Sequence, residues 1–437
     1  MLYSLYRLYI IGIHCALALI ACARPCVGLQ SSVPRVSKLA IDVEGTVPET
    51  YTHADLAQLI RRHGYDVEQH FAETKDGYVL GLYRILPNKP AETSAYPVVL
   101  QHGLLDTAAT WVVNDARQSL GLILVDHGYD VWLANSRGST FSRNHTGFAP
   151  ESANFWDFTM DEMATFDIPT TIDYVRRRTG SEDVALVAHS QGGAISLAAL
   201  SEDTIPTGHV SVLITLAPAV YLKYISSVPL QFLAKIHADT LFEVAGRKEF
   251  LPTNQDMSDL FGEFCSVQPQ QCASILTAIC GFNPKNIDES RLPIYLAYAP
   301  GGTSVKNIAH WAQRVRDAES KAAFSFRKYD YGTVCDVGNV RRPCNQRIYG
   351  HLAPPSYDLS RIRARSDVKI GVIYGLEDKL ADPIDVQRVI DQLGDRLVFK
   401  KALLGFEHID FTWSVNAARD VYTDVLHLLP ASSRRPL

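Results

Sequence analysis

The chain has 437 residues, of which 47% are hydrophobic and 20% are charged, which is ordinary for a globular protein. This length can bury one large core or two modest ones. The formal net charge is -5 and Lys and Arg are spread along the chain rather than in runs, so nucleic acid is excluded as an expected partner.

The first 23 residues have the layout of a secretory signal peptide. An arginine near the start precedes an apolar run from Leu8 to Ile20, and Ala-Cys-Ala follows at 21–23. A helix that spans a bilayer needs about 20 apolar residues, whereas this run is shorter and is interrupted by His14. We therefore expect cleavage after Ala23 rather than a retained membrane anchor, and no other stretch is long and apolar enough to span a bilayer.

The chain after the signal peptide begins with a polar, proline-punctuated stretch, which predicts an extended arm over residues 24–50. Residues 53–63 have helical spacing, with apolar side chains on one face. Two strand-like runs at 65–74 and 77–86 flank Lys75-Asp76-Gly77, which is a hairpin signal.

From about residue 97 onward, short apolar strands alternate with helices. The strand candidates lack polar alternation, as expected of strands that are covered on both faces. They are PVVLQ (97–101), YDVWLA (129–134), VALVAH (184–189) and VSVLITL (210–216). Helical patterns such as QSLGLILVDHG and DIPTTIDYVRRRTG lie between them. This alternation predicts an α/β fold with a doubly wound, mostly parallel sheet flanked by helices.

The alternation stops near Pro218 and resumes with VKIGVIYG (368–375), LVFKKAL (397–403) and a last helix around 416–429. Residues 218–345 are largely helical or irregular in pattern. Because sheet strands lie on both sides of this segment in the sequence, we predict an inserted, mainly helical cap or lid rather than a separate tandem domain. The core is then assigned to residues 51–217 and 346–437.

The cysteines fit an exported protein. Removal of the signal peptide leaves six of the eight cysteines. Two close pairs predict small disulfide loops, and no histidine neighbours either pair at zinc-finger spacing, so no metal site is expected. These pairs are Cys265 with Cys272 and Cys335 with Cys344, while Cys26 and Cys280 could pair or stay free. The single sequon Asn144-His145-Thr146 is compatible with glycosylation at Asn144.

Two serines have the small neighbours, two before and two after, of a nucleophile turn. Ser190 lies in ALVAHSQGGAISLAAL, with Ala188 and Gly192 in those positions. Ser136 lies in DVWLANSRGSTF with similar neighbours, but the residues that follow are rich in Gly, Ser, Asn and Thr, which is typical of a loop. Ser190 is followed by a helix-compatible run, whose N-terminus would direct free amides at the reacting oxygen. The sequence therefore predicts Ser190 as the nucleophile.

A serine nucleophile needs a base, and the base needs an orienting carboxylate, in the order Ser, acid, His on loops after later strands. The loop after LVFKKAL offers His408 as the base. His351 follows no strand and His427 lies within the last helix pattern, so both are interpreted as structural or surface residues. The loop after VKIGVIYG offers three carboxylates, which the residues alone leave open: Glu377, Asp378 and Asp382.

A tetrahedral intermediate needs backbone donors that are already in place for its oxyanion. The amide of Gln191, directly after the nucleophile, supplies the first. The second is expected from QHGLLDTAATW (101–111), where His102-Gly103 follows an early strand.

Several motifs together resemble those of the acid lipases, the group of α/β-hydrolases that contains gastric lipase and lysosomal acid lipase. The resemblance runs from about residue 52 to 428, and its motifs occur in family order and spacing. They are QHGLLDTAATW, HGYDVWLANSRGSTFSR, NFWDFTMDEMATFDIPTTIDYV, AHSQGG, PGGTSVKNIAHWAQ, LEDKLADP and EHIDF.

The resemblance implies a role for each site residue: Ser190 as nucleophile, Asp378 as acid, His408 as base, and Leu104 and Gln191 as oxyanion-hole donors. It also implies that NSRG is a structural loop near the site, that the cap covers an acyl-binding cleft, and that Cys265 pairs with Cys272. Two departures are Ala188, where the family usually has Gly, and residues 333–350, which look like an insertion with their own cysteine pair.

The implied function is a secreted or lysosomal/vacuolar-type serine lipase without a cofactor. It would hydrolyse neutral lipids, triacylglycerols or sterol esters, through an acyl-enzyme at a lipid–water interface. Two alternatives are an esterase for shorter acyl groups and a lipid-binding protein that has lost turnover.

Overall fold

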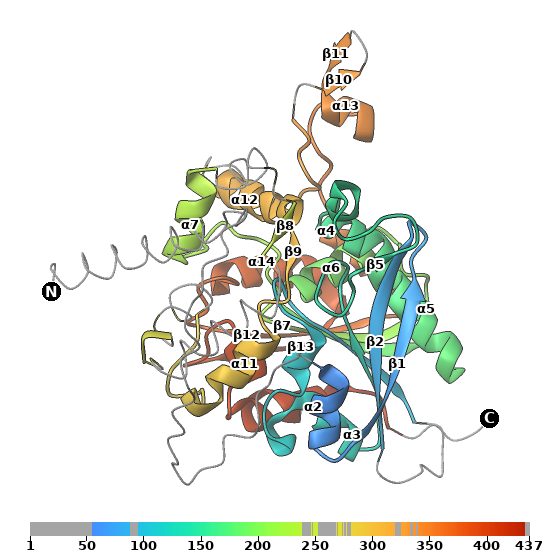
Figure 1. Ribbon diagram of the computed structural model, residues 1–437, viewed down its shortest axis with the longest axis vertical. Helices are drawn as coiled ribbons and strands as arrows, with labels where there is room; N and C mark the ends of the chain where they lie inside the picture. The colour runs from blue at the N-terminus through green and yellow to red at the C-terminus, as the bar shows by residue number, and fades with distance from the viewer. Residues whose placement is uncertain are drawn as a thin grey trace, which may run out of the picture. The chain divides into compact units, whose positions relative to one another are not determined.

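Figure 1 shows the computed structural model of the chain. It describes residues 55–87, 95–237, 246, 248–251, 268, 270–272, 274, 277, 281–319, 325–332, 335–337 and 340–432. The chain divides into two compact units, residues 1–52 and 53–437, and the first lies outside the described residues. The predicted signal peptide (1–23), the predicted arm (24–50), Cys26, Cys265 and Cys280 therefore lie outside them as well.

The second unit is built on one large sheet. Its strand order is β1-β2-β4-β3-β6-β7-β12-β13, with β5 paired to β2. Six neighbouring strands of this order are parallel, namely β4, β3, β6, β7, β12 and β13. Strand β2 is antiparallel to β1, β4 and β5. The strands are β1 (Asp66–Glu73), β2 (Tyr78–Leu86), β3 (Pro97–Gln101), β4 (Asp130–Ala134), β5 (Asn144–His145), β6 (Val184–His189), β7 (Val210–Leu216), β12 (Lys369–Gly375) and β13 (Leu397–Leu403).

The predicted mostly parallel sheet is confirmed. Each apolar run named from the sequence contains a strand, and four runs match the observed bounds: 97–101, 184–189, 210–216 and 397–403. All residues of β3, β4 and β6 are buried, as expected of strands covered on both faces. The predicted hairpin is also present, with every residue of β1 paired to β2.

Helices pack along this sheet (Figure 1). α3 contacts β4, α5 contacts β3, α6 contacts β6, α14 contacts β12 and α16 contacts β7. The last predicted helix begins with a π-helical turn over Ala418–Tyr422 and continues as α16. The core helices are α2 (Leu56–Arg62), α3 (Leu120–Asp126), α4 (Met160–Glu162), α5 (Ile168–Thr179), α6 (Gln191–Ser201), α14 (Pro383–Leu393), α15 (Asp410–Trp413) and α16 (Thr423–Leu428).

In the segment between β7 and β12, none of the described residues belongs to a strand of the large sheet. Its described helices are α7 (Val228–Lys235), α11 (Leu292–Tyr298), α12 (Val305–Glu319) and α13 (Cys344–Tyr349). It also holds two short antiparallel strand pairs that no sequence pattern predicts: β8 (Glu249–Phe250) with β9 (Thr303–Ser304), and β10 (Cys335–Val337) with β11 (Val340–Arg342). The boundaries of a cap at 218 and 345 stay a prediction.

Cys272 and Cys344 are both disulfide-bonded. Their predicted partners are Cys265, which lies outside the described residues, and Cys335, of which the structure describes only the backbone. The two pairings therefore stay predictions.

A buried histidine ties the loop after β4 to the end of β3. His102 Nε2 accepts the backbone N–H of Ser136 at 3.1 Å, and its Nδ1 donates to the carbonyl of Gly103 at 2.8 Å. Burial lowers the pKa of His102 to about 4, so the ring is neutral near pH 7, as an accepting Nε2 requires. The Ser136 hydroxyl accepts a hydrogen bond from Gln101 Nε2 at 2.9 Å, so Ser136 belongs to the framework of this loop.

The next residue of that loop, Arg137, joins three separate segments. Its buried guanidinium donates to Asp76, in the turn between β1 and β2, at 2.6 and 3.0 Å. It also donates to Asp167, in the π-helical turn before α5, at 2.7 Å. A buried charge needs such paired carboxylates, because an uncompensated charge in the interior is costly. The NSRG segment is thus fixed by polar contacts to the turn between β1 and β2 and to the π-helical turn before α5.

The end of β12 approaches the loop after β13 very closely. A Cβ atom placed on Gly375 would lie 2.1 Å from the carbonyl oxygen of Phe406, which is much closer than carbon and oxygen atoms pack. Glycine at this position therefore allows the loop that begins at Leu376 to lie beside the loop that carries His408.

We predict that Gly375→Ala lowers the free energy of unfolding by about 3 kcal/mol, at the upper end of the range for overpacking, because the clash is with backbone. Urea denaturation of the two proteins measures this difference. Gly147→Ala is the matched control, since its added Cβ would meet no atom nearer than 3.6 Å. Equal urea midpoints for Gly375→Ala and the wild type would contradict the close approach.

A second prediction concerns His102. The pKa of this histidine is about 4 in the folded protein and about 6.5 in the unfolded chain. Its contribution to stability is therefore complete above about pH 6.5 and is lost as the pH falls toward 4, because the unfolded chain binds the proton first. We expect His102→Gln to lose less unfolding free energy than the wild type between pH 7 and pH 4, by up to about 3 kcal/mol. His427→Gln, at an exposed position, is the control and should keep the wild-type slope. A parallel pH dependence in His102→Gln and the wild type would overturn the prediction.

Candidate active site

Ser190 lies on the sharp turn between β6 and α6. Its φ of 54° is in the left-handed region, which costs a residue other than glycine about 1–3 kcal/mol. Neighbouring glycines make room for the turn. A Cβ on Gly103 would lie 2.9 Å from Ser190 Cβ, and one on Gly192 would lie 2.6 Å from the carbonyl oxygen of His102. Ala188 is accommodated within β6, where it pairs with Gln101 and Thr215.

Three side chains that are distant in sequence form one chain of hydrogen bonds at this turn. His408 Nε2 lies 2.7 Å from Ser190 Oγ, and His408 Nδ1 lies 2.8 Å from Asp378 Oδ2. All three residues are buried, with exposed fractions of 5% for Ser190, 2% for Asp378 and 4% for His408. With a proton on Nδ1 facing the carboxylate, Nε2 is free to accept the hydroxyl proton. This is the geometry of an activated serine with an oriented base.

The structure separates the three carboxylates of the loop after β12. Asp378 faces His408, and its Oδ1 accepts the backbone N–H groups of Leu380 and Ala381 at 2.8 and 2.9 Å. Glu377 instead accepts the N–H of Gly405 at 2.6 Å. Asp382 is the N-cap of α14. Of the three carboxylates, therefore, only Asp378 contacts the imidazole.

The loop that carries His408 is held by contacts that no local sequence pattern indicates. His189 donates from Nε2 to the carbonyl oxygen of His408 at 3.0 Å, and the two ring centroids are 5.0 Å apart. Burial, together with the neighbouring His408, lowers the pKa of His189 to about 3, so its ring is neutral. The adjacent Glu407 forms an ion pair with Lys379 at 2.9 Å, which joins the acid loop to the base loop.

The remaining predicted residues are placed as follows. Gln191 is the first residue of α6, and Leu104 follows Gly103, whose backbone lies against Ser190. Their roles as oxyanion donors stay predictions. His351 and His427 are exposed, and neither belongs to the hydrogen-bonded series of Ser190, His408 and Asp378. Asn144 is exposed in β5, where glycosylation stays a prediction.

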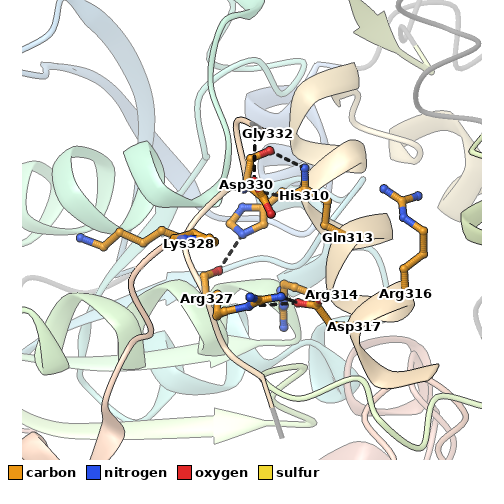
Figure 2. A pocket seen from close by; sticks show the side chains of 10 residues that line it. His310, Gln313, Arg314, Arg316, Asp317, Arg327, Lys328, Asp330 and Gly332 are labelled. Carbon is orange, nitrogen blue, oxygen red and sulfur yellow. Dashed lines mark hydrogen bonds and ion pairs between the residues drawn. The ribbon is translucent and has the colours of Figure 1, made fainter. Parts of the chain in front are cut away.

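An open pocket of about 320 Å³, lined largely by charged and polar residues, lies beside α12 (Figure 2). It contains none of the residues predicted for catalysis, and several of its charges are paired, such as Arg327 with Asp317 and Lys328 with Glu202. The lining residues are His310, Gln313, Arg314, Arg316, Asp317, Arg327, Lys328, Asp330, Gly332 and Pro354.

Within the described part of the chain, no group of three or more His, Cys, Asp or Glu side chains is arranged to hold a metal ion. No helix among those residues combines the length and the apolar character needed to cross a bilayer.

The sequence matches two families of known proteins. Residues 56–115 match the family described as "Partial alpha/beta-hydrolase lipase region", and residues 96–415 match "alpha/beta hydrolase fold". A solved structure, a soluble variant of monoglyceride lipase from Saccharomyces cerevisiae in complex with a substrate analog, is similar with a TM-score of 0.50 and 14% identity. The match covers 84% of this chain and 96% of the monoglyceride lipase chain. Because the identity is low, the similarity supports the fold alone.

Curated relatives are similar over most of the chain. Human gastric triacylglycerol lipase is 37% identical over 383 residues, which covers 86% of this chain and 90% of that protein. Human lysosomal acid lipase/cholesteryl ester hydrolase is 33% identical over 389 residues, which covers 88% of this chain and 92% of that protein. With this identity over this length, the chain belongs to the acid lipase family of the α/β-hydrolases, the family of gastric and lysosomal acid lipases.

Proposed function

We propose that the protein is a serine lipase that hydrolyses carboxylic ester bonds of neutral lipids through an acyl-enzyme. The observation that carries the proposal is the hydrogen-bonded series from Asp378 through His408 to Ser190, at 2.8 and 2.7 Å. Such a series activates a hydroxyl that is otherwise a weak nucleophile.

In the first half of the reaction, Ser190 Oγ attacks the ester carbonyl carbon while His408 Nε2 takes the hydroxyl proton. Asp378 keeps the imidazole in the correct tautomer and stabilises the imidazolium that forms. The amides of Gln191 and Leu104 are the proposed donors to the oxyanion. Collapse of the tetrahedral intermediate expels the alcohol, which receives the proton from His408 and leaves the acyl group on Ser190.

In the second half, a water molecule attacks the acyl carbonyl and His408 again accepts the proton. The second tetrahedral intermediate releases the fatty acid and restores the Ser190 hydroxyl. The proposed steps use only side chains and backbone amides of this chain together with water.

The relatives support the substrate class. One is named for triacylglycerols and another for cholesteryl esters, so we propose triacylglycerols, sterol esters or both as the substrates, taken up at a lipid–water interface. We also propose a route through the secretory pathway to the outside of the cell or to the lysosome or vacuole, which the similarity to the gastric and the lysosomal lipase supports for the first two destinations.

We expect Ser190→Ala to lower hydrolysis of emulsified triolein and cholesteryl oleate at least about 10⁴-fold, because the acyl-enzyme can no longer form. Rates are measured from pH 4 to pH 8, and a fluorophosphonate probe should label the wild type at Ser190 but not the variant. Ser136→Ala, which changes the other serine with similar neighbours, should keep most of the activity. Hydrolysis retained by Ser190→Ala would refute the proposed nucleophile.

A further inference from the structure

The side chain of Gln191 is held by a helix of the segment between β7 and β12. Its Oε1 accepts the indole N–H of Trp311 at 2.5 Å and the amide N–H of Asn307 at 3.1 Å, both from α12. Gln191 is 3% exposed, so these hydrogen bonds form in the interior, where an unpaired amide oxygen would be costly. The residue after the nucleophile therefore has a fixed side chain.

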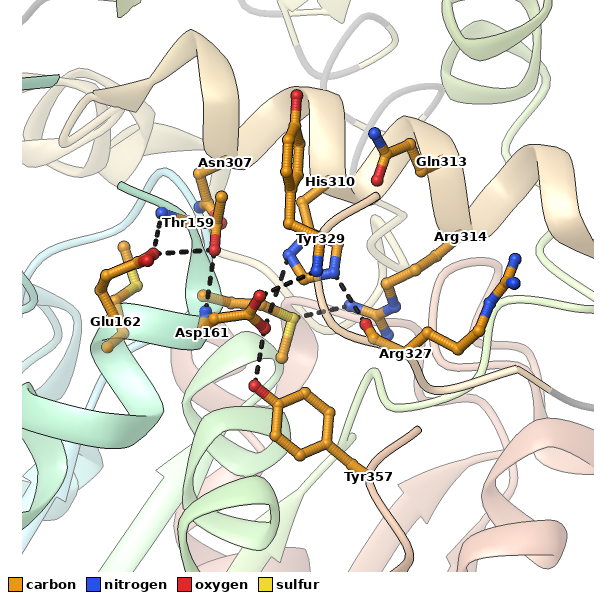
Figure 3. A network of polar contacts seen from close by, with 12 residues as sticks. Thr159, Asp161, Glu162, Asn307, His310, Gln313, Arg314, Arg327, Tyr329 and Tyr357 are labelled. Atoms are coloured by element: carbon orange, nitrogen blue, oxygen red, sulfur yellow. Dashed lines mark hydrogen bonds and ion pairs between the residues drawn. The ribbon is translucent and has the colours of Figure 1, made fainter. Parts of the chain in front are cut away.

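The contacts come from one face of α12, because residues spaced by three or four positions lie on the same side of a helix. Asn307, Trp311 and Arg314 have this spacing. Figure 3 shows Asn307 and Arg314 projecting from α12 on the same side as His310. Asn307 is itself held at the helix start, where its side chain donates to Thr303 Oγ1 at 3.2 Å and its backbone N–H donates to Ser304 Oγ at 2.9 Å.

Arg314 anchors the same face of α12 to the segment that follows β7. Its Nη2 donates to the carbonyl oxygen of Ala219 at 2.9 Å and to that of Val220. The guanidinium also lies over the rings of Trp311 and Phe326, at 4.8 and 5.3 Å. Such ring contacts favour a buried cation.

The segment that Arg314 holds is in turn bonded to the nucleophile turn. The backbone N–H of Ala219 lies 3.4 Å from the carbonyl oxygen of Ser190, while the N–H of Ser190 donates to Leu216 at 3.0 Å. Thus α12 is linked to the nucleophile turn by two sets of hydrogen bonds. One set runs directly to the side chain of Gln191, and the other runs from Arg314 through Ala219 to the backbone of Ser190.

These contacts matter because the backbone of Ser190 is strained, and a strained residue persists only where its surroundings hold it. The amide of Gln191 follows that strained residue directly, so its direction depends on the same support. We propose that Trp311 and Asn307 are positioning residues for ester hydrolysis, which hold Gln191 so that its backbone amide points at the developing oxyanion. This inference rests on the proposed function and adds a role for α12 to it.

The test is a double-mutant cycle on the hydrogen bond between Trp311 and Gln191. Trp311→Phe removes the indole N–H and keeps a ring beside Arg314, and Gln191→Met removes the acceptor and keeps the length and the backbone amide. The substrate is p-nitrophenyl butyrate, a soluble ester, so that binding to a lipid surface does not enter the rate. Trp156→Phe is the matched control, since its indole N–H donates to the Pro150 carbonyl and this contact involves no residue of the nucleophile turn.

We expect each single variant to lower kcat about tenfold with KM changed less than twofold, because the contact acts on the transition state. The double variant should be no slower than the slower single variant, because both changes remove the same hydrogen bond. Phosphorylation of Ser190 by diethyl p-nitrophenyl phosphate should slow by a similar factor, and the pH at half-maximal kcat should not move. Trp156→Phe should match the wild type in all of these measurements.

Three results would overturn the inference: an unchanged kcat in Trp311→Phe, a loss that appears in KM instead, or single effects that multiply in the double variant. If Trp311→Phe does not fold, Asn307→Ser removes the other donor to Gln191 and is judged by the same criteria, in a cycle with Gln191→Met. A wild-type protein that neither hydrolyses the ester nor reacts at Ser190 would refute the proposed function itself. If instead the wild type is active and Trp311→Phe has the same kcat, only the positioning role is refuted.

Discussion

The hydrogen bond between His408 Nε2 and Ser190 Oγ joins residues that are 218 positions apart in the chain. The rest of the structure keeps these two atoms together. Because β6, β12 and β13 run in the same direction, their carboxyl ends meet at one edge of the sheet, and the loops with Ser190, Asp378 and His408 leave from that edge. Gly375 and the ion pair of Lys379 with Glu407 then bring the last two loops into contact.

The sheet was predictable because its strands are unambiguous in the sequence. The runs at 184–189 and 210–216 are rich in apolar and β-branched residues and are too short for buried helices, so a strand is the interpretation that fits them. The pairs β8 with β9 and β10 with β11 were missed, because strands of two or three residues carry no periodicity. The π-helical turn at Ala418–Tyr422 was missed for a related reason, since its side-chain pattern resembles that of an ordinary helix.

The candidate site was only partly predictable. Strand and loop order selected Ser190 and His408, but the residues alone could not choose among three carboxylates in one loop, since the choice depends on which oxygen reaches His408. The anchors that hold the site, such as Arg137 with Asp167 and Trp311 with Gln191, join segments that are distant in sequence. Pairing of this kind leaves no local pattern. His189 had a signal, its place directly before Ser190, but nothing in the sequence indicated its contact with the backbone of His408.

The two-sided attachment of α12 bears on how this scaffold could be simplified. An inserted segment that only covered the substrate could be deleted or replaced by a short linker, and the catalytic residues of the smaller protein would keep their positions. Here the deletion would also strip Gln191 of two donors and free the chain at Ala219 and Val220. Any minimal version of the protein, and any graft of its inserted segment onto another hydrolase, must therefore keep α12 with its partners.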